Sequence, residues 1–193
     1  PGDSAHRRRN DGGGDLMTHS HVWTHADAHD PGRRRIGDDD ETPLRISGIE
    51  ELKAHAGEDL GVTGWHDVTQ AEVDAFAELT GDRQWIHVDP ERARETPFGG
   101  TIAHGYYTLS LAARFLEELL QVDGMGVMIN YGINKLRFPA ALPVGDRVRM
   151  HLRLGAVDDV PGGVMVTSEL SFEREGGEKP VCVAETLMLA YAS

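Results

Sequence analysis

Apolar residues return every three or four positions in two segments of the first half of the chain, which is the spacing of one helix face. The first segment follows Ser47 and the second follows Thr69, and each hydroxyl residue stands three positions before a glutamate. This capping-box pattern predicts that a helix begins at each of them, the first ending at Gly57 and the second near Gly81. The apolar positions are Ile49, Leu52 and Ala56 in the first helix, and Val73, Phe76, Ala77 and Leu79 in the second.

A longer apolar segment covers residues 106–120. A helix that is apolar nearly all round is buried in the protein. This segment is too short to span a membrane and is interrupted by Arg114, so the pattern predicts a buried helix that begins at about Gly105. A short helix over residues 90–95 is expected before it, because an Asp-Pro pair supplies an N-cap and then Pro90 at the first helical position.

The apolar period changes from helical to two in the second half of the chain. This alternation predicts four strands, and the short turns between them predict antiparallel pairing. One strand has a basic polar face, because Arg147, Arg149 and Arg153 share it with His151. Another strand is expected earlier, over residues 62–68. The four later strands are expected over residues 125–138, 147–154, 164–173 and 181–191.

The order of these elements indicates an α+β fold, in which an antiparallel sheet wraps around the long buried helix. A chain of 193 residues is enough for one such domain and a tail. We place the domain at residues 44–193. Residues 1–43 contain few large apolar residues, so we expect a disordered tail there. The absence of an initial Met and the presence of Met17 suggest that part of this tail is added or upstream sequence.

Composition narrows the function classes. The net charge of −13 and a pI near 5.1 argue against a nucleic-acid binder, although a local basic cluster is enough for an anionic ligand. The single cysteine, Cys182, cannot form an internal disulfide, so a reducing cytoplasm is expected. No signal peptide or membrane segment is evident. Four tail histidines allow a metal site, but a flexible polar tail is favoured; they are His19, His21, His25 and His29.

A carboxylate and an imidazole, Asp82 and His87, stand five positions apart between the predicted helices. Residues at this spacing on a regular helix point about 140° away from each other. The two side chains therefore converge only if the backbone between them is a loop, and Gly81 before them and Pro90 after them favour a loop. Taken singly, Asp82 is typical of a turn residue and His87 of a loop histidine.

The predicted buried helix starts at a glycine that follows His104. The first turn of a helix has free backbone N–H groups and the positive end of the helix dipole. Gly105 also allows a ligand to approach the backbone closely. The Gly105 N–H is therefore a candidate donor to a developing negative charge, such as an enolate oxygen.

Three motifs make the chain recognisable: Thr-Gly-Asp at residues 80–82, Ile-His-Val-Asp at 86–89 and Ile-Ala-His-Gly at 102–105. In order and spacing they resemble the MaoC-like dehydratase family of (R)-specific enoyl-CoA hydratases, and within it the nodulation protein N-like branch. The resemblance covers residues 59–192. One departure is Gln84-Trp85, where many family members have Asn-Pro.

The resemblance implies a hot-dog fold, usually as a homodimer, and a hydro-lyase in the cytoplasm. Its substrate would be a trans-2-enoyl-CoA, or the corresponding acyl-carrier-protein thioester, hydrated to the (R)-3-hydroxyacyl form. Asp82 and His87 would hold the one water that supplies both the hydroxyl and a proton. The reaction needs neither a redox cofactor nor a metal.

Other residues have candidate roles with open alternatives. Ser110 either bonds Asp82 from the buried helix or bonds back to its own helix. His104 either caps the helix or lines the site, and a structural role is favoured. Lys135 and Arg137 share one strand face and are candidates for the phosphates of coenzyme A. Two rival functions are a hot-dog thioesterase, which releases a free thiol, and a non-catalytic acyl-binding module.

Overall fold

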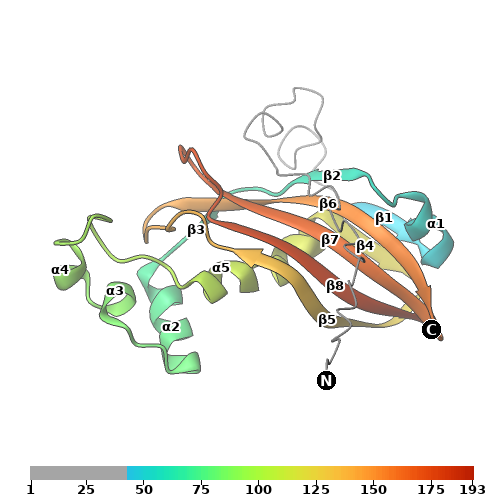
Figure 1. Cartoon of the computed structure of the whole chain (residues 1–193), viewed down its shortest axis with the longest axis horizontal. Coiled ribbons are helices and arrows are strands. Elements are labelled where there is room, and N and C mark those ends of the chain that lie inside the picture. The colour runs from blue at the N-terminus through green and yellow to red at the C-terminus, as the bar shows by residue number, and fades with distance from the viewer. Residues whose placement is uncertain (1–42) are drawn as a thin grey trace, which may run out of the picture.

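The computed structural model describes residues 43–193. The predicted disordered tail up to residue 42, with its histidines, lies outside these residues. Figure 1 shows long strands lying side by side, with most of the helices toward one end of the molecule. In order, the elements are β1 (Leu44–Ser47), α1 (Gly48–Ala54), β2 (Asp59–Val62), β3 (His66–Asp67), α2 (Gln70–Thr80), α3 (Trp85–Val88), α4 (Pro90–Ala93), α5 (Gly105–Ser110), α6 (Ala112–Leu119), β4 (Leu120–Asp123), β5 (Met125–Arg137), β6 (Arg147–Val160), β7 (Gly163–Arg174) and β8 (Cys182–Ala192).

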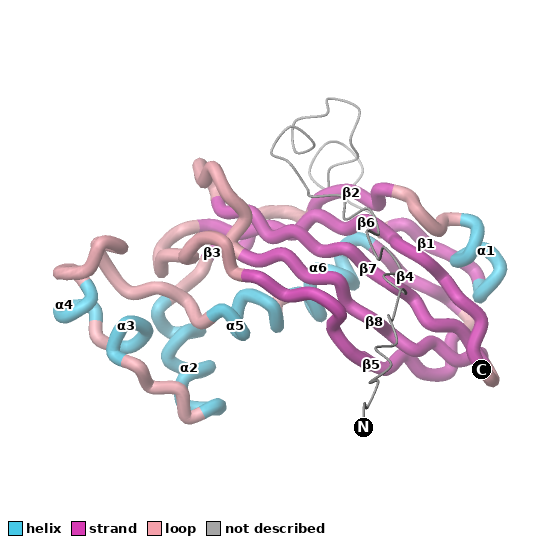
Figure 2. The backbone as a smooth tube through the Cα atoms, viewed as in Figure 1, coloured by secondary structure: helices cyan, strands magenta, loops and turns pink. Residues whose placement is uncertain are grey.

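The main sheet has the strand order β2-β6-β7-β8-β5, and β3 also pairs with β6. Every pair in it is antiparallel, as the short turns predict. A separate two-stranded sheet joins β1 and β4 in parallel. Figure 2 shows α2, α3 and α4 beyond one end of the strands, while α5 and α6 run along the sheet. The α+β prediction is therefore confirmed.

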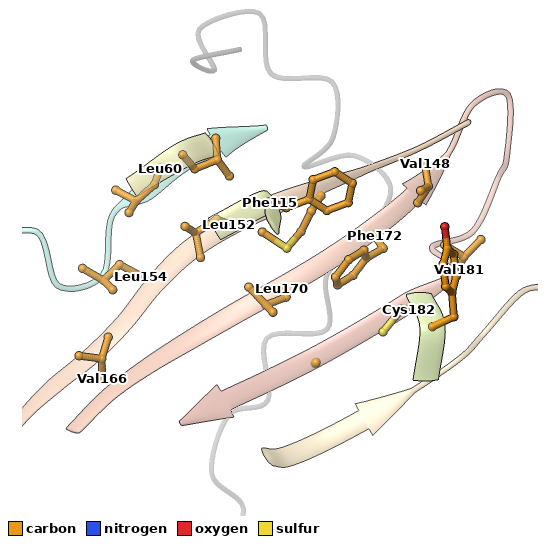
Figure 3. Packing of buried hydrophobic residues seen from close by; sticks show 14 of the residues in the cluster. Leu60, Phe115, Val148, Leu152, Leu154, Val166, Leu170, Phe172, Val181 and Cys182 are labelled. Atoms are coloured by element: carbon orange, nitrogen blue, oxygen red, sulfur yellow. The ribbon is translucent and has the colours of Figure 1, made fainter. Parts of the chain in front are cut away.

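The core lies between the sheet and the α5–α6 helix. Strands β6 and β7 alternate as predicted, and their inward side chains are buried. Phe115 of α6 packs against Phe172 of β7, with ring centroids 6.1 Å apart, as Figure 3 shows. Cys182 is fully buried, and burial raises the pKa of its thiol to about 12, as expected of a small hydrophobe rather than a nucleophile.

The long helix is buried on one face only, which corrects the expectation of a helix buried all round. It is almost continuous, because Leu111 keeps right-handed helical angles between α5 and α6. Tyr107 and Phe115 face the sheet and are buried, whereas Tyr106 is 69% exposed. In a single chain the sheet covers only one side of the helix, so apolar residues on the other side remain exposed.

The arginines on the basic face of β6 are paired with glutamates on β7 and directly after it. Arg149 bonds Glu173 at 2.6 Å and Arg153 bonds Glu169 at 2.8 Å, each directly across the strand pair, and Arg147 pairs with Glu175. His151 lies on the same face as predicted, because the register runs without a shift from Val148 to Leu154, but it is not exposed. It is buried, and its Nε2 lies 2.7 Å from Asp59 Oδ1 on β2.

Several predicted boundaries moved. The strand expected over residues 62–68 forms two short pieces, β2 and β3, and α4 is shorter than the helix expected over residues 90–95. The capping box of α2 is complete, with Thr69 and Glu72 bonded in both directions. At α1 the side chain of Ser47 makes no cap bond, and its backbone N–H donates to Glu51 rather than to Glu50.

Replacing Phe172 with Ala should lower the free energy of unfolding by about 3–5 kcal/mol, because it removes a fully buried ring and leaves a cavity. Chemical denaturation monitored by circular dichroism measures this loss. Leu79→Ala is the matched control, since Leu79 is 84% exposed and its truncation should change stability by less than about 0.5 kcal/mol. Equal losses in the two variants would contradict the core described above.

Candidate active site

The carboxylate and imidazole of Asp82 and His87 converge beyond the end of α2. That helix ends at Gly81, which adopts a left-handed φ of 78°. Residues 82–84 are not helical, and α3 begins only afterwards. This break brings one ligand atom from each of Asp82, His87 and His104 within 4.8 Å of one another. The prediction that a loop brings Asp82 and His87 together is confirmed.

His87 has a defined tautomer. Its Nδ1 lies 2.7 Å from the Ile102 carbonyl, which only accepts, so Nδ1 carries the proton and Nε2 keeps a free lone pair. Burial lowers the pKa of His87 and the nearby His104 lowers it further, while the Ile102 bond and Asp82 act in the opposite direction. The net shift is downward, so this imidazole is neutral at pH 7 and able to accept a proton at Nε2.

Two polar residues that the sequence analysis did not identify hold the α3 turn. Gln70, the first residue of α2, donates from Nε2 to the His87 carbonyl at 2.7 Å. Thr101 in turn donates its hydroxyl to Gln70 Oε1 at 2.5 Å. These partners lie 17 and 31 positions apart along the chain, so no local sequence signal indicates them.

His104 contacts both members of the pair. It occupies the N-cap position of α5, but its side chain makes no cap hydrogen bond, so the helix-cap alternative is wrong. Its Nε2 lies 2.9 Å from the main-chain oxygen of Asp82, and its ring stacks on His87 with centroids 3.8 Å apart and planes 27° apart. The ring is buried and also packs against Phe76.

The arrangement of Asp82, His87 and His104 does not suit a metal ion. Imidazole binds a metal in the plane of its ring at about 2.0–2.1 Å. The two rings are nearly parallel at 3.8 Å, so their in-plane lone pairs cannot meet at that distance. A pair of proton-transfer groups fits this geometry better than a ligand set.

Ser110 is not a partner of Asp82, which corrects one alternative of the sequence analysis. Its hydroxyl donates back to the Tyr107 carbonyl at 2.7 Å, and the residue is exposed. The serine lies on the face of α5 that the sheet does not cover. The other alternative, a bond within its own helix, is confirmed.

Gly105 begins α5, as predicted, and has a close aromatic neighbour. A Cβ atom at this position would lie 2.9 Å from the Phe138 ring, so no larger residue fits without displacing that ring. Phe138 also contacts Tyr106 edge to face, at 6.2 Å between centroids. The N–H of Gly105 lies in the first helical turn, where it has no acceptor within the helix.

The two predicted coenzyme A contacts lie at the end of β5. Arg137 directly precedes Phe138, so this end of β5 lies next to the start of α5. Arg137 donates to the neighbouring Leu136 carbonyl, and Lys135 lies 3.8 Å from Glu185. Among the described residues, neither Lys135 nor Arg137 forms a short ion pair.

The fold and this pair define a class: an α+β domain whose sheet packs along one helix, with a carboxylate and an imidazole close to the histidine that precedes that helix. Residues 51–174 match the family described as MaoC like domain, so the chain belongs to this family of dehydratases and hydratases, as its motifs predict. Among residues 43–193, no helix has the length and hydropathy needed to cross a membrane.

Named relatives agree with this assignment. The chain is 50% identical over 141 residues to 3-hydroxyacyl-thioester dehydratase Z of Mycobacterium tuberculosis, covering 72% of this chain and 93% of the relative. It is 35% identical over 144 residues to nodulation protein N of Rhizobium leguminosarum, covering 73% and 89%. The solved (R)-hydratase from A. caviae superposes with a TM-score of 0.58 at 27% identity, over 69% of this chain and 94% of that one.

The hot-dog fold is confirmed by such neighbours. The unliganded R-hydratase PhaJ1 from Pseudomonas aeruginosa superposes with a TM-score of 0.58 over 72% of this chain and 83% of that chain. Its identity of 24% supports the fold alone.

His87 should titrate below the ordinary histidine value of about 6.5. Burial lowers its pKa, so the midpoint of its titration should fall below that value. NMR of the imidazole ring protons over pH 4–9 measures the midpoint, and His87→Gln assigns the signal. The free energy of unfolding should also decrease as the pH falls through this range, because the unfolded state binds the proton first. A midpoint at or above 6.5 would contradict this environment.

Proposed function

We propose that this protein is a hydro-lyase that interconverts a trans-2-enoyl thioester and the (R)-3-hydroxyacyl thioester. The observation that carries the proposal is that Asp82 converges with His87, whose Nδ1 is bonded to the Ile102 carbonyl and whose Nε2 is therefore the nitrogen left to accept a proton. Hydration of a conjugated thioester needs a base for the water, an acid for Cα and donors at the thioester oxygen. The names of the dehydratase and hydratase relatives support the same reaction class.

In this mechanism one water lies between Asp82 and His87. The Asp82 carboxylate accepts one hydrogen bond from the water, and His87 Nε2 removes the other proton as the oxygen attacks Cβ. The electron pair of the Cα–Cβ double bond moves onto the thioester, which becomes an enolate. His87 then returns the proton to Cα, so both the hydroxyl and the proton come from the same water.

The start of α5 would stabilise the enolate. The Gly105 N–H and the positive end of the helical segment point to a region where negative charge on the thioester oxygen is favourable. Lys135 and Arg137 would lie on the path of the coenzyme A phosphates, near the same helix start. An acyl-carrier-protein thioester presents the same reacting atoms. The cytoplasmic location inferred from the single cysteine stays a prediction.

Asp82→Asn should lower kcat by about 100- to 10,000-fold, because an amide orients the water poorly and carries no negative charge. The assay follows loss of the enoyl-thioester absorbance of crotonyl-CoA, with a thiol reagent in a parallel trace. The product is then hydrolysed and its 3-hydroxy acid enantiomers are separated, and the (R) form is expected.

Glu91→Gln is the matched control for this variant. Glu91 is an exposed carboxylate on the neighbouring helix α4 and pairs only with Arg94 in the described residues, so its loss should leave the rate unchanged. Thiol release by the wild type would instead identify a thioesterase. If neither the enoyl absorbance nor the thiol signal changes with short and long enoyl-CoA substrates, both activities on coenzyme A thioesters are excluded. Enoyl carrier-protein substrates would then be tested.

We also propose that the protein forms a homodimer through β5. This strand is the last in the sheet, so within residues 43–193 its outer edge has no partner strand. It exposes an unusual number of large apolar side chains for an edge strand, and such edges are prone to pair with another chain. These side chains are Val127, Met128, Ile129, Tyr131 and Ile133.

Tyr131→Lys should weaken the dimer at least about 10-fold, because it places a charge in an apolar interface. Sedimentation velocity over a range of concentrations measures the change. Leu79→Lys is the control, since Leu79 is exposed on α2 and outside β5. A wild-type protein that is monomeric at every concentration would contradict the dimer.

A further inference from the structure

We propose that His104 is a positioning residue for Asp82 and His87: it ties the Asp82 segment to the start of α5 and limits the stacked imidazole pair to one positive charge. The inference rests on the proposed function, because positioning matters only if Asp82 and His87 act on a substrate. It goes beyond that function, since His104 itself neither accepts the water proton nor touches the reacting atoms.

The first argument concerns the backbone of Asp82. The hydrogen bonds that link Asp82 to its neighbours are local and long: its N–H reaches Thr80 Oγ1 at 3.3 Å, and its Oδ1 accepts from the Gln84 N–H at 3.4 Å. The bond from His104 Nε2 to the Asp82 carbonyl is shorter, at 2.9 Å, and spans 22 positions of the chain. Among the described residues, it therefore fixes this exposed loop residue to the buried start of the helix.

The second argument concerns charge. Carbonyl acceptors on both sides require His87 to carry its proton on Nδ1 and His104 to carry its proton on Nε2. Two buried imidazolium rings with centroids 3.8 Å apart would repel each other strongly. The pair therefore holds at most one positive charge, and His87 accepts the water proton only while His104 is neutral.

Few other charged groups surround His87 and His104 and could affect their protonation. Asp82 faces His87 across the loop, and His104 faces it across the stack. From α2, the groups in contact are uncharged: the Gln70 amide at the His87 carbonyl and the Phe76 ring against His104. His104 is also one of the causes, after burial, that hold the pKa of His87 down.

The third argument is that one nitrogen of His104 is unused. Its Nδ1 is buried and has no hydrogen-bond partner in the part of the chain that the structure describes. A ring needed only for packing would not leave a buried acceptor unpaired, since this costs stability. His104→Phe tests this role directly. The substitution keeps an aromatic ring stacked on His87 and removes only the Nε2 hydrogen bond and the ability to carry a charge.

The experiment compares His104→Phe and His104→Gln with the wild type. His104→Phe should lower kcat about 10- to 100-fold on crotonyl-CoA with little change in KM, because Asp82 loses its tie. His104→Gln keeps a donor that can reach the Asp82 carbonyl, and it should recover part of kcat. The NMR titration of His87 should move upward in His104→Phe. Phe76→Leu is the control, because it changes packing on His104 and keeps both of its contacts.

Two results would overturn the inference: a His104→Phe enzyme with wild-type kcat, or a His87 midpoint that does not move in that variant. If the variants fail to fold, nitrogen-15 NMR of the wild-type histidines decides instead, and a proton on Nδ1 of His104 would refute the proposed tie. This NMR measurement needs no substrate. A protein inactive on enoyl thioesters, but with the predicted tautomers, would therefore contradict the proposed function rather than the contacts of His104.

Discussion

The hydrogen bond from His87 Nδ1 to the Ile102 carbonyl is the interaction on which the site depends. It selects the tautomer that leaves Nε2 free, and it joins the α3 turn to the segment that leads into α5. That segment is itself anchored to the turn before β6, because Ala103 donates to the Leu142 carbonyl and Val144 donates to the Thr101 carbonyl. The imidazole thus takes its position from the domain core, although it lies on a four-residue helix.

The two proposed proton-transfer groups differ in burial and in charge. His87 is buried and kept neutral, whereas Asp82 stays exposed on a loop. This division gives one neutral base and one water-accessible carboxylate within a few ångströms, in a protein that is strongly acidic as a whole. Elsewhere charges are matched locally, as in the arginine–glutamate pairs across β6 and β7, so the basic face of β6 is neutralised by its own sheet.

The helix formed by α5 and α6 links the fold to the site. One face packs on the sheet through Phe115 and Tyr107, and its first residue, Gly105, follows His104, whose ring stacks on His87. Its other face and the edge strand β5 leave apolar side chains exposed, among them Tyr106 and Tyr131. In the proposed homodimer, a second copy of the chain would cover both the outer face of this helix and the edge of β5. That would explain why the helix sequence is apolar on nearly every side.

The sequence by itself determined the fold class, the strand alternation and the helix break between Asp82 and His87 that their convergence requires. Each depends on local rules: capping at Thr69, alternation along β6 and β7, and the left-handed turn at Gly81. The tertiary structure alone decided which face of α5 the sheet covers, and therefore that Ser110 bonds within its own helix. It alone also brought Gln70 and His104 to the pair, because hydrogen bonds spanning 17 and 22 positions arise only when separate elements pack together.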